Sequence, residues 1–368
     1  MKKIIIAPDS FKETMSNIEV ASIIYDTLYA LYPDYEYKLM PVADGGEGSL
    51  NSIVSDVNDL HTIECNNANM EMCSVKYGII KNNGIVEVAE NIGFKYKKPF
   101  SNPGNTTSYG VGEVIKELKD QGIKKIYVCL GGTITNDGGC GLASCLGVKF
   151  YDSDNKLFVP TGFTLNKIDK IDNSKYLEEY KDVSLIGLCD VTNPLYGKNG
   201  ASYVYAPQKG ANDEDVKVLD EGLKHLDEVV KRDLNIDAQL NPGSGAAGGI
   251  GYAIQSFLNG KLKKGIETIL SLMDFKKEIN DETIIITGEG KLDSQSLQGK
   301  VIDGILKVVK NKKVPVIVIT GKVEGNIEEF KNKGISKIIV TNPKNLPFSE
   351  VKKKCKEQLQ EAIKQLEI

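Results

Sequence analysis

The residues best suited to chemistry lie in glycine-rich segments that also carry carboxylates, hydroxyls and lysines. The most informative segment is LGGTITNDGGCG, residues 130–141, which follows an apolar run rich in β-branched residues. Hydroxyls, an amide and the Asp137 carboxylate stand there between two glycine pairs. Glycine pairs let the backbone approach an anion closely, and successive N–H groups form anion-binding nests. We therefore predict that Gly131, Gly132 and Thr133 bind phosphate and that Asp137 takes part in catalysis.

Three further segments repeat this combination of residue types: ADGGEG (43–48), PGSGAAGG (242–249) and ITGEGKLD (286–293). Acids next to a helix start can also be ordinary caps, which leaves a structural role open for ADGGEG and ITGEGKLD. PGSGAAGG has no acid, and its small residues could instead serve close helix packing. A divalent cation bound to phosphate requires acids, whereas phosphate itself requires backbone N–H groups and lysine. The candidates are Asp44 for substrate, Glu289 and Asp293 for the metal, and Gly243, Gly245 and Lys291 for the nucleotide phosphates.

Six other residues, in four segments of the chain, complete the candidate site. Asp9, Ser10 and Lys12 follow the first apolar run and are candidates for binding a small anionic substrate, although a plain β–α turn explains them equally well. Asp190 ends another apolar run and is a candidate general base, with an Asx-turn as the alternative. Ser108, at the start of an expected helix, is a further substrate-binding candidate. Lys209, in the segment APQKGA, is a candidate for stabilising the transferred phosphoryl group.

The scarcity of two residue types excludes several kinds of catalysis. The chain contains two histidines, His61 and His225, and its only arginine is Arg232. Neither histidine lies beside a glycine-rich segment, so nucleophilic triads and histidine-rich metal sites are excluded. A phosphate site must use lysine and backbone N–H groups, because a bidentate arginine is absent elsewhere. The remaining chemistry, with carboxylates, lysines, hydroxyls and amides, is typical of Mg²⁺-dependent phosphoryl transfer.

Bulk properties indicate a two-domain cytoplasmic protein. A chain of 368 residues exceeds one hydrophobic core, and its formal net charge of −4 argues against nucleic acid as a partner. No segment approaches the roughly 18 apolar residues of a membrane span, and the apolar start at residues 4–7 is too short for a signal peptide. Seven cysteines without a CxxC pair indicate reduced thiols.

The apolar patterns predict an α/β protein. Ser16 and Glu19 form a capping-box signature for a helix over residues 17–31, and residues 62–89 read as antiparallel hairpins. A helix is expected from residue 47 to about 57, and a strand over 283–287 that ends before GEGKLD. Strands and helices alternate towards both ends, which favours an open parallel-sheet (flavodoxin/Rossmann-like) domain with an inserted mixed α+β domain. We place the first at residues 1–60 plus 242–368 and the second at 61–241, with the site in a cleft between them.

In chain order, the segments APDSFKE, ADGGEG, TTSYGVGE, LGGTITNDGGCG, CDVTNPLYGKNGAS, APQKGA, PGSGAAGGIGY and ITGEGKLDSQSLQGK resemble the glycerate kinase family known from bacterial glycerate and glycolate metabolism. The resemblance covers residues 3–322 and implies ATP-dependent phosphorylation of D-glycerate, with ATP and Mg²⁺ as cofactors. It favours 2-phosphoglycerate over 3-phosphoglycerate as the product. One departure is Lys291, where arginine is frequent, which keeps the charge but gives up a bidentate phosphate contact.

On this hypothesis the glycerate carboxylate lies near Ser10 and Lys12. Asp190 orients or deprotonates the substrate hydroxyl, and Asp137 is the alternative residue for this role. Lys209 or Lys291 stabilises the transferred phosphoryl group. The alternatives are a kinase for another small hydroxy acid and a nucleotide-binding regulatory module without catalysis, with a Mg²⁺-dependent phosphatase third. The expected partners are the small-molecule substrates, without nucleic acid or membrane, and a homodimer is a candidate assembly.

Overall fold

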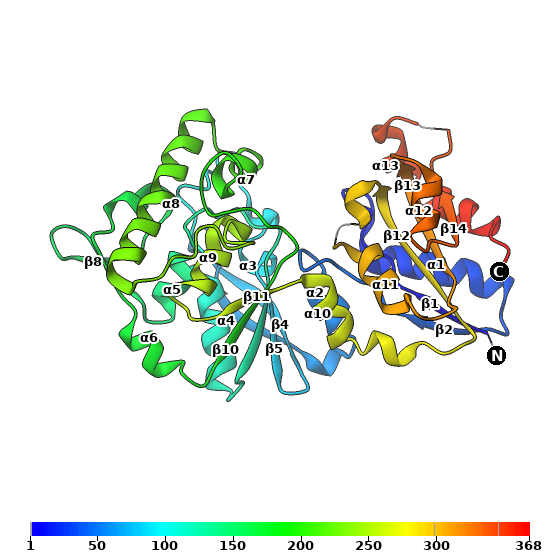
Figure 1. Ribbon diagram of the computed structural model, residues 1–368, viewed down its shortest axis with the longest axis horizontal. Coiled ribbons are helices and arrows are strands. Elements are labelled where there is room, and N and C mark those ends of the chain that lie inside the picture. The colour runs from blue at the N-terminus through cyan, green and yellow to red at the C-terminus, as the bar shows by residue number, and fades with distance from the viewer. Residues whose placement is uncertain (1, 298, 345) are drawn as a thin grey trace. The chain divides into compact units, whose positions relative to one another are not determined.

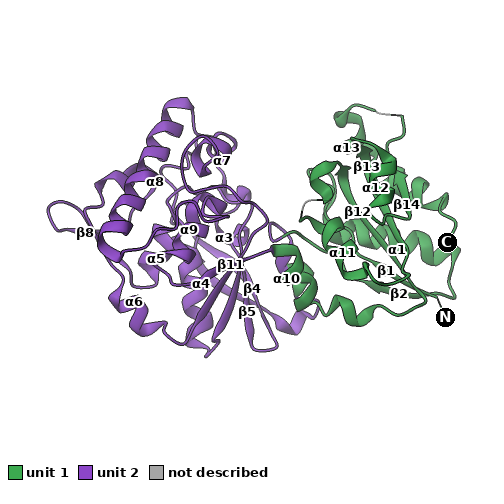
Figure 2. Cartoon of the chain, viewed as in Figure 1, with its two compact units in different colours: residues 1–44, 51–53, 265–368 green, residues 45–50, 54–264 purple. Residues whose placement is uncertain are grey.

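The chain divides into two compact units (Figure 2). The computed structural model describes residues 2–297, 299–344 and 346–368. Unit 1 comprises residues 1–44, 51–53 and 265–368, and unit 2 comprises residues 45–50 and 54–264. The sequence predicts domain boundaries at 60/61 and 241/242. These boundaries concern independently folding parts of the chain and stay a prediction.

Unit 1 is built on a parallel five-stranded sheet in the order β14-β13-β12-β1-β2 (Figure 1). The central strands are almost entirely apolar, as expected for a sheet covered on both faces. Ile4 and Ile6 point into a core shared with helices on one face, while Ile5 points to the opposite face. The strands are β1 (Lys3–Ile6), β2 (Glu36–Leu39), β12 (Thr283–Leu292), β13 (Val316–Val323) and β14 (Lys337–Val340).

The helices of unit 1 cover both faces of this sheet. They are α1 (Asn17–Leu31), α10 (Gly265–Leu272), α11 (Val301–Val309), α12 (Ile327–Asn332) and α13 (Phe348–Lys364). Helices α1 and α13 pack together over the Ile4 face. The predicted capping box is confirmed, since the Ser16 hydroxyl accepts the Glu19 N–H while the Glu19 carboxylate accepts the Ser16 N–H.

The strand order of unit 1 reverses between β1 and β12. From β1 the chain passes through α1 to β2 on one side, whereas from β12 it passes through α11 and α12 to β13 and β14 on the other. Because such crossovers are right-handed, α1 and α11 lie on opposite faces of the sheet. A crevice therefore opens at the carboxyl ends of β1 and β12, where ligands bind in open α/β sheets.

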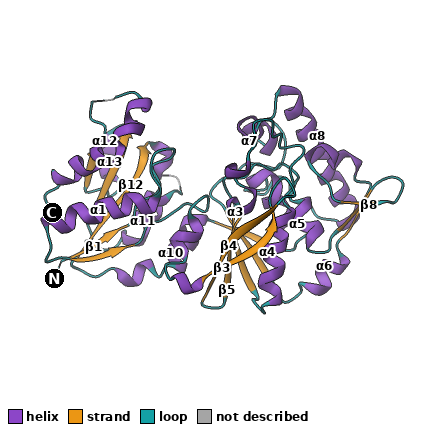
Figure 3. Cartoon of the chain, turned by 180° about the vertical axis from the view of Figure 1, so that it is seen from behind, coloured by secondary structure: helices purple, strands orange, loops and turns teal. Residues whose placement is uncertain are grey.

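Unit 2 contains a mixed six-stranded sheet in the order β11-β10-β6-β5-β4-β3, of which β3 and β4 are antiparallel to their neighbours. Helix α4 packs against β3 and β5 (Figure 3). The strands are β3 (Leu60–Asn66), β4 (Met72–Ile80), β5 (Asn83–Glu87), β6 (Lys125–Cys129), β10 (Ser184–Leu188) and β11 (Lys261–Lys263). A small sheet contains β7 (Lys149–Tyr151), β8 (Leu157–Phe158) and β9 (Lys170–Asp172). The remaining helices are α2 (Ser49–Ile53, shared with unit 1), α3 (Ala89–Ile92), α4 (Tyr109–Asp120), α5 (Cys140–Cys145), α6 (Ser174–Glu179), α7 (Ala201–Lys209), α8 (Asp213–Leu234) and α9 (Ile250–Gln255).

The α/β class with parallel sheets and the antiparallel hairpins are confirmed. The turn between β4 and β5 uses Lys81 and Asn82, both with positive φ, as a tight hairpin turn requires. All seven cysteines are free thiols, as expected. Within the described ranges, every helix is too short or too polar to cross a bilayer.

The boundaries of two elements were predicted wrongly: strand β12 at its end, and helix α2 at both ends, since it stops at Ile53 and not near residue 57. Strand β12 continues to Leu292 instead of ending at Thr287, because β13 pairs with it as far as Leu292. Helix α2 spans Ser49–Ile53 instead of starting at residue 47, because Gly48 adopts a left-handed conformation immediately before it. The segment GEGKL is therefore mostly strand, and its side chains alternate between the two faces of the sheet.

Candidate active site

The crevice of unit 1 holds a pocket of about 640 Å³. It is lined from the loop after β1, from the outer half of β12 and the segment after it, from the end of β13, from the segment after β14 and from the start of α13. The pocket brings together seven residues that the sequence singled out: Asp9, Ser10, Lys12, Asp44, Glu289, Lys291 and Asp293. Lys300, immediately before α11, and Lys322, on β13, line it as well. The pocket is therefore a mixed field of carboxylates and ammonium groups at the carboxyl edge of a parallel sheet.

Carboxylates in this pocket are held in an unfavourable environment for negative charge. Asp9 is 9% exposed, and burial together with the nearby Asp44 raises its pKa to about 7, although the Ser10 N–H and Lys12 act in the opposite direction. Burial also raises the pKa of Glu289. The Oε1 atom of Glu289 is buried and lacks a hydrogen-bond partner among the described residues. A buried carboxylate oxygen without a donor fits a site that a cation completes.

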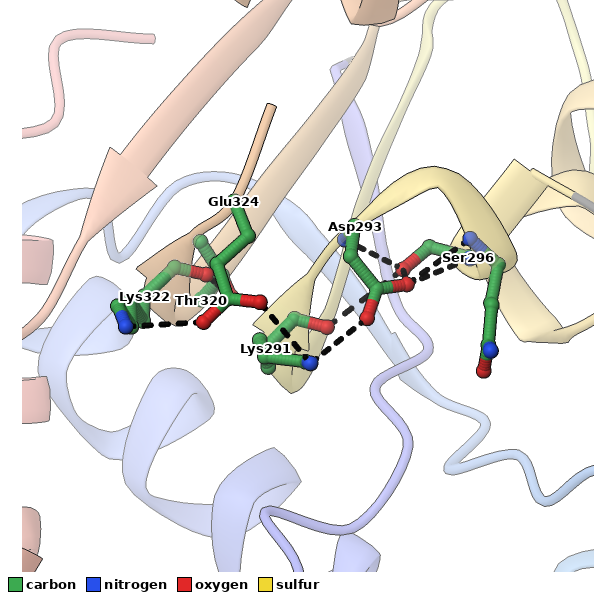
Figure 4. A network of polar contacts seen from close by, with 7 residues as sticks. Lys291, Asp293, Ser296, Thr320, Lys322 and Glu324 are labelled. Atoms are coloured by element: carbon green, nitrogen blue, oxygen red, sulfur yellow. Dashed lines mark hydrogen bonds and ion pairs between the residues drawn. The ribbon is translucent and has the colours of Figure 1, made fainter. Parts of the chain in front are cut away.

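The two other candidates on or after β12 are engaged with each other (Figure 4). The Lys291 ammonium lies 2.9 Å from Asp293 Oδ2 and 3.2 Å from Glu324 Oε2, and Lys322 lies 2.9 Å from Glu324 Oε1. Asp293 also accepts the Gln295 N–H at 2.9 Å. Burial disfavours the charge on Asp293, but Lys291 and this N–H outweigh it and lower the pKa of the carboxyl group. Asp293 is therefore a partner of Lys291 and a loop cap, and as a metal ligand it would have to leave both contacts.

In unit 2, Asp137 is the centre of a fully buried cluster. Its Oδ2 atom accepts the Ser108 N–H at 2.7 Å, the Ser108 hydroxyl at 2.8 Å and the Gly141 N–H at 3.2 Å. Its Oδ1 atom accepts the Gly139 N–H at 3.1 Å. Burial nevertheless raises its pKa. These contacts join the starts of α4 and α5, so the carboxylate orders the backbone around it.

Lys209 ends α7 with its ammonium group in the interior. The residue is 3% exposed, and its Nζ donates to the Thr135 carbonyl at 2.6 Å and to the Thr133 hydroxyl at 3.4 Å. Burial lowers the pKa of Lys209 to about 7, and the negative charge of Asp137 opposes this shift. The structure thus brings Thr133, Asp137, Ser108 and Lys209 into one neighbourhood.

Glu87, at the end of β5, is a functional candidate that the sequence analysis missed. It is 3% exposed, and its two oxygens accept the N–H groups of Gly48 and Leu50 at 2.9 and 2.8 Å. Burial raises its pKa to about 7. A Cβ on Gly131 would lie 2.6 Å from the Cα of Gly46, so the two glycine-rich loops touch there. An acid inside the apolar stretch GIVEVA was the available signal.

Asp190, Gly243 and Gly245 lie together at the carboxyl end of β10. Asp190 is half-buried in the loop that follows the strand. A Cβ on Gly243 would lie 2.9 Å from Cys189 Sγ, and the Gly245 N–H donates to the Asn193 carbonyl at 2.9 Å. Gly243 has a positive φ of 87°, which only glycine adopts readily. The glycine pair is thus packed against the loop that carries Asp190.

The sequence analysis assigns Asp137, Asp190 and Glu289 to one site between two domains; because these residues belong to both units, their joint placement around one cation stays a prediction. Within the described ranges, no group of three or more His, Cys, Asp or Glu side chains is arranged to hold a metal ion. Mg²⁺ in kinases is commonly bound by one or two carboxylates together with substrate phosphates and waters, and such a site needs no complete protein cage.

Comparison with known proteins gives the family. A model of the Glycerate kinase family matches residues 4–367. Glycerate kinase from Bacillus cereus is 39% identical over 352 residues, covering 94% of this chain and 92% of that protein. Glycerate 2-kinase from Escherichia coli is 38% identical over 340 residues, covering 91% and 89%.

A solved structure agrees with both sequence matches. The crystal structure of a Salmonella typhimurium LT2 protein assigned as glycerate kinase 2 has a TM-score of 0.82 and 32% identity, covering 99% of this chain and 96% of that one. Because the family match spans nearly the whole sequence, this chain belongs to the glycerate kinase family.

Proposed function

We propose that this protein transfers the γ-phosphate of ATP to the C2 hydroxyl of D-glycerate, giving 2-phosphoglycerate and ADP. The observation that carries the proposal is the family match over residues 4–367. The choice of C2 is supported by the name of the Escherichia coli relative, a glycerate 2-kinase. We place the reaction in the cytoplasm, in keeping with metabolic use of ATP.

In this proposal the unit 1 pocket holds the charged end of the nucleotide. Lys12 and Lys300 supply positive charge at the carboxyl ends of the strands, and α11 begins directly after Lys300 with the positive end of its dipole. Glu289 is the carboxylate that we assign to Mg²⁺, because its Oε1 atom lacks a partner among the described residues. When bound, Mg²⁺ would neutralise charge that develops on the phosphate oxygens. Asp293 is not assigned to the metal, since Lys291 already holds it.

We assign the substrate hydroxyl to Asp190. A carboxylate in a half-buried loop at the end of a strand can accept a hydrogen bond from a hydroxyl and receive its proton as the phosphoryl group transfers. Asp137 and Lys209 are assigned to positioning, because their polar atoms are already engaged with the chain. In phosphoryl transfer, positioning and charge stabilisation supply most of the rate enhancement.

The test is phosphorus NMR of the product after incubation with D-glycerate, ATP and Mg²⁺, together with a coupled assay of ADP release. We expect the 2-phosphoglycerate signal, loss of turnover after chelation of Mg²⁺ and recovery when Mg²⁺ is restored. A 3-phosphoglycerate signal would correct the regiochemistry. Faster ADP release with another hydroxy acid would instead identify a different acceptor, and nucleotide binding without turnover on any acceptor would indicate a regulatory module.

A further inference from the structure

The unit 1 pocket has an apolar wall that phosphate, Mg²⁺ and glycerate leave unexplained. Phe11 and Met15 line it from the loop after β1, and Phe348, Val351 and Cys355 line it from the first turns of α13. The α13 residues are spaced by three and four positions, so they form one face of the helix. This wall lies in the same pocket as the lysines and carboxylates described above.

Phe348 is the unusual member of this wall. Phe11 and Met15 are each 4% exposed and belong to the core, whereas Phe348 is 51% exposed. A large aromatic side chain left half in solvent at a pocket is available to stack on a planar ligand group. A surface phenylalanine alone needs no explanation, but this one continues the apolar wall of a pocket that is also lined by charged side chains.

The segment leading to Phe348 is held in place by the side chain of Asn342. Its Nδ2 donates to the Leu346 carbonyl at 3.1 Å, and its Oδ1 accepts the Leu346 N–H at 2.9 Å. Both residues line the pocket. Pro347 follows and starts α13 with a fixed φ of −58°. The aromatic wall is therefore built on a pinned turn at the end of β14.

Size indicates what such a pocket accommodates. A volume of about 640 Å³ lies within the range of roughly 300–1,000 Å³ that is usual for cofactor and drug-sized ligands. A three-carbon hydroxy acid is far smaller and has no ring. A ligand with a planar aromatic ring at one end and a polyanion at the other uses both parts of the lining, and a purine nucleoside polyphosphate has this chemistry.

We propose that the unit 1 pocket binds the whole nucleotide, with the purine base against Phe348 and Val351 and the phosphates against Lys12 and Lys300. This inference rests on the proposed kinase function and assigns its nucleotide site. It also changes the expected role of Lys12, which contacts phosphate instead of the carboxylate of glycerate. The acceptor then lies outside the apolar part of this pocket.

The chain contains no tryptophan, which allows a direct optical test. Phe348→Trp places the only tryptophan on the proposed wall, and the matched control Phe100→Trp places it at a 98% exposed phenylalanine of unit 2 that does not line the pocket. Each variant is titrated with ADP, inorganic pyrophosphate and D-glycerate. We expect saturable quenching by ADP for Phe348→Trp alone, displacement of ADP by pyrophosphate without quenching, and no response to D-glycerate.

A second variant gives the affinity. Phe348→Ala should weaken ADP binding about fivefold by calorimetry, as for the loss of one aromatic contact, with KM for D-glycerate and the thermal midpoint unchanged. Phe100→Ala should change none of these. Quenching by D-glycerate, or ADP binding by calorimetry without quenching or loss of affinity in the Phe348 variants, would overturn the inference while leaving the kinase function intact. Absence of both ADP binding and turnover in the unmodified chain would overturn both.

Discussion

Replacement of Asp137 by asparagine should distinguish a structural carboxylate from a catalytic base. The side chain is fully buried and accepts four hydrogen bonds at Oδ2, including a long one of 3.5 Å from the Thr107 hydroxyl, and one, from the Gly139 N–H, at Oδ1. Asparagine has the same shape but replaces one oxygen by an NH₂ group. With the nitrogen at the Oδ2 position, four donors would face a donor. The amide should therefore adopt the other orientation and lose only the bond from Gly139.

The magnitude follows from that count. A hydrogen bond to a charged acceptor contributes about 1.5–3 kcal/mol, and a buried donor left without a partner costs a similar amount. Burial of the negative charge, which raises the pKa of Asp137, offsets part of this loss when the charge is removed. We expect Asp137→Asn to lower the free energy of unfolding by about 2 kcal/mol, and Asp137→Ala by clearly more, because alanine leaves all five donors without this acceptor.

The assay is urea unfolding followed by circular dichroism, combined with amide hydrogen exchange. A local loss of about 2 kcal/mol should speed exchange of the Ser108, Gly139 and Gly141 amides roughly 30-fold, if they open locally. Ser108→Ala is the comparison variant: it removes one donor to Asp137 and the acceptor of the Leu142 N–H but keeps the carboxylate, so it should have a smaller effect than Asp137→Ala. If Asp137→Asn leaves unfolding and exchange unchanged while turnover disappears, our structural assignment is wrong and Asp137 is the base.

Asp190→Asn should lower kcat by about 10²–10⁴-fold, the range for general base catalysis, with the thermal midpoint and ADP affinity unchanged; near-normal turnover would remove Asp190 from the mechanism. Burial lowers the folded-state pKa of Lys209 from 10.5 to about 7. Between these two pH values the unfolded chain binds more protons than the folded chain. The contribution of Lys209 to the free energy of unfolding therefore rises with pH across this window. Lys209→Met should flatten the pH dependence of the unfolding free energy between about pH 7 and 10, and an unchanged slope would show that the ammonium is not the titrating group. Lys291→Ala should raise KM for ATP several-fold, because it removes an ammonium group that lines the same pocket as Lys12 and Lys300. The thermal midpoint should not change, because exposed ion pairs such as those with Asp293 and Glu324 contribute little to stability; an unchanged KM would exclude a phosphate contact.

Local sequence patterns were sufficient for the elements whose causes are local. The capping box at Ser16 and the turn at Asn82 depend on residues within a few positions, so both were predictable. The end of β12 was not, because it is fixed by pairing with β13, across more than twenty intervening residues. The same holds for Lys291, whose partner Glu324 lies on the segment after the neighbouring strand.

The sequence was sufficient to predict which residue types form the candidate site, but not which of them bind a ligand and which hold the backbone in place. Apolar runs ending in glycine and acid mark strand ends, and Asp9 and Glu289 do line one pocket at such an edge. Glu87 escaped notice because its partners are backbone N–H groups of Gly48 and Leu50, which no side-chain pattern encodes. Phe348 likewise has no distinguishing sequence pattern, because what sets it apart is its exposure at the pocket.

In this chain, polar groups that already have hydrogen-bond partners within the protein differ from those that a ligand can still bind. The glycine-rich segment around Asp137 suggested N–H groups available to an anion, yet those of Gly139 and Gly141 donate to the chain's own carboxylate. In the same way, the Glu87 carboxylate accepts the Gly48 N–H. In these loops an internal anion already does what a phosphate would do. By contrast, Glu289 Oε1 lacks a partner within the described residues, and Phe348 leaves an aromatic face half in solvent. Thr135 Oγ1 and Asn136 Oδ1, in the loop before Asp137, also lack a partner within the described residues, so that loop is satisfied only in part. In the unit 1 pocket, an unpartnered carboxylate oxygen and an exposed aromatic face occur together, and a ligand would satisfy both.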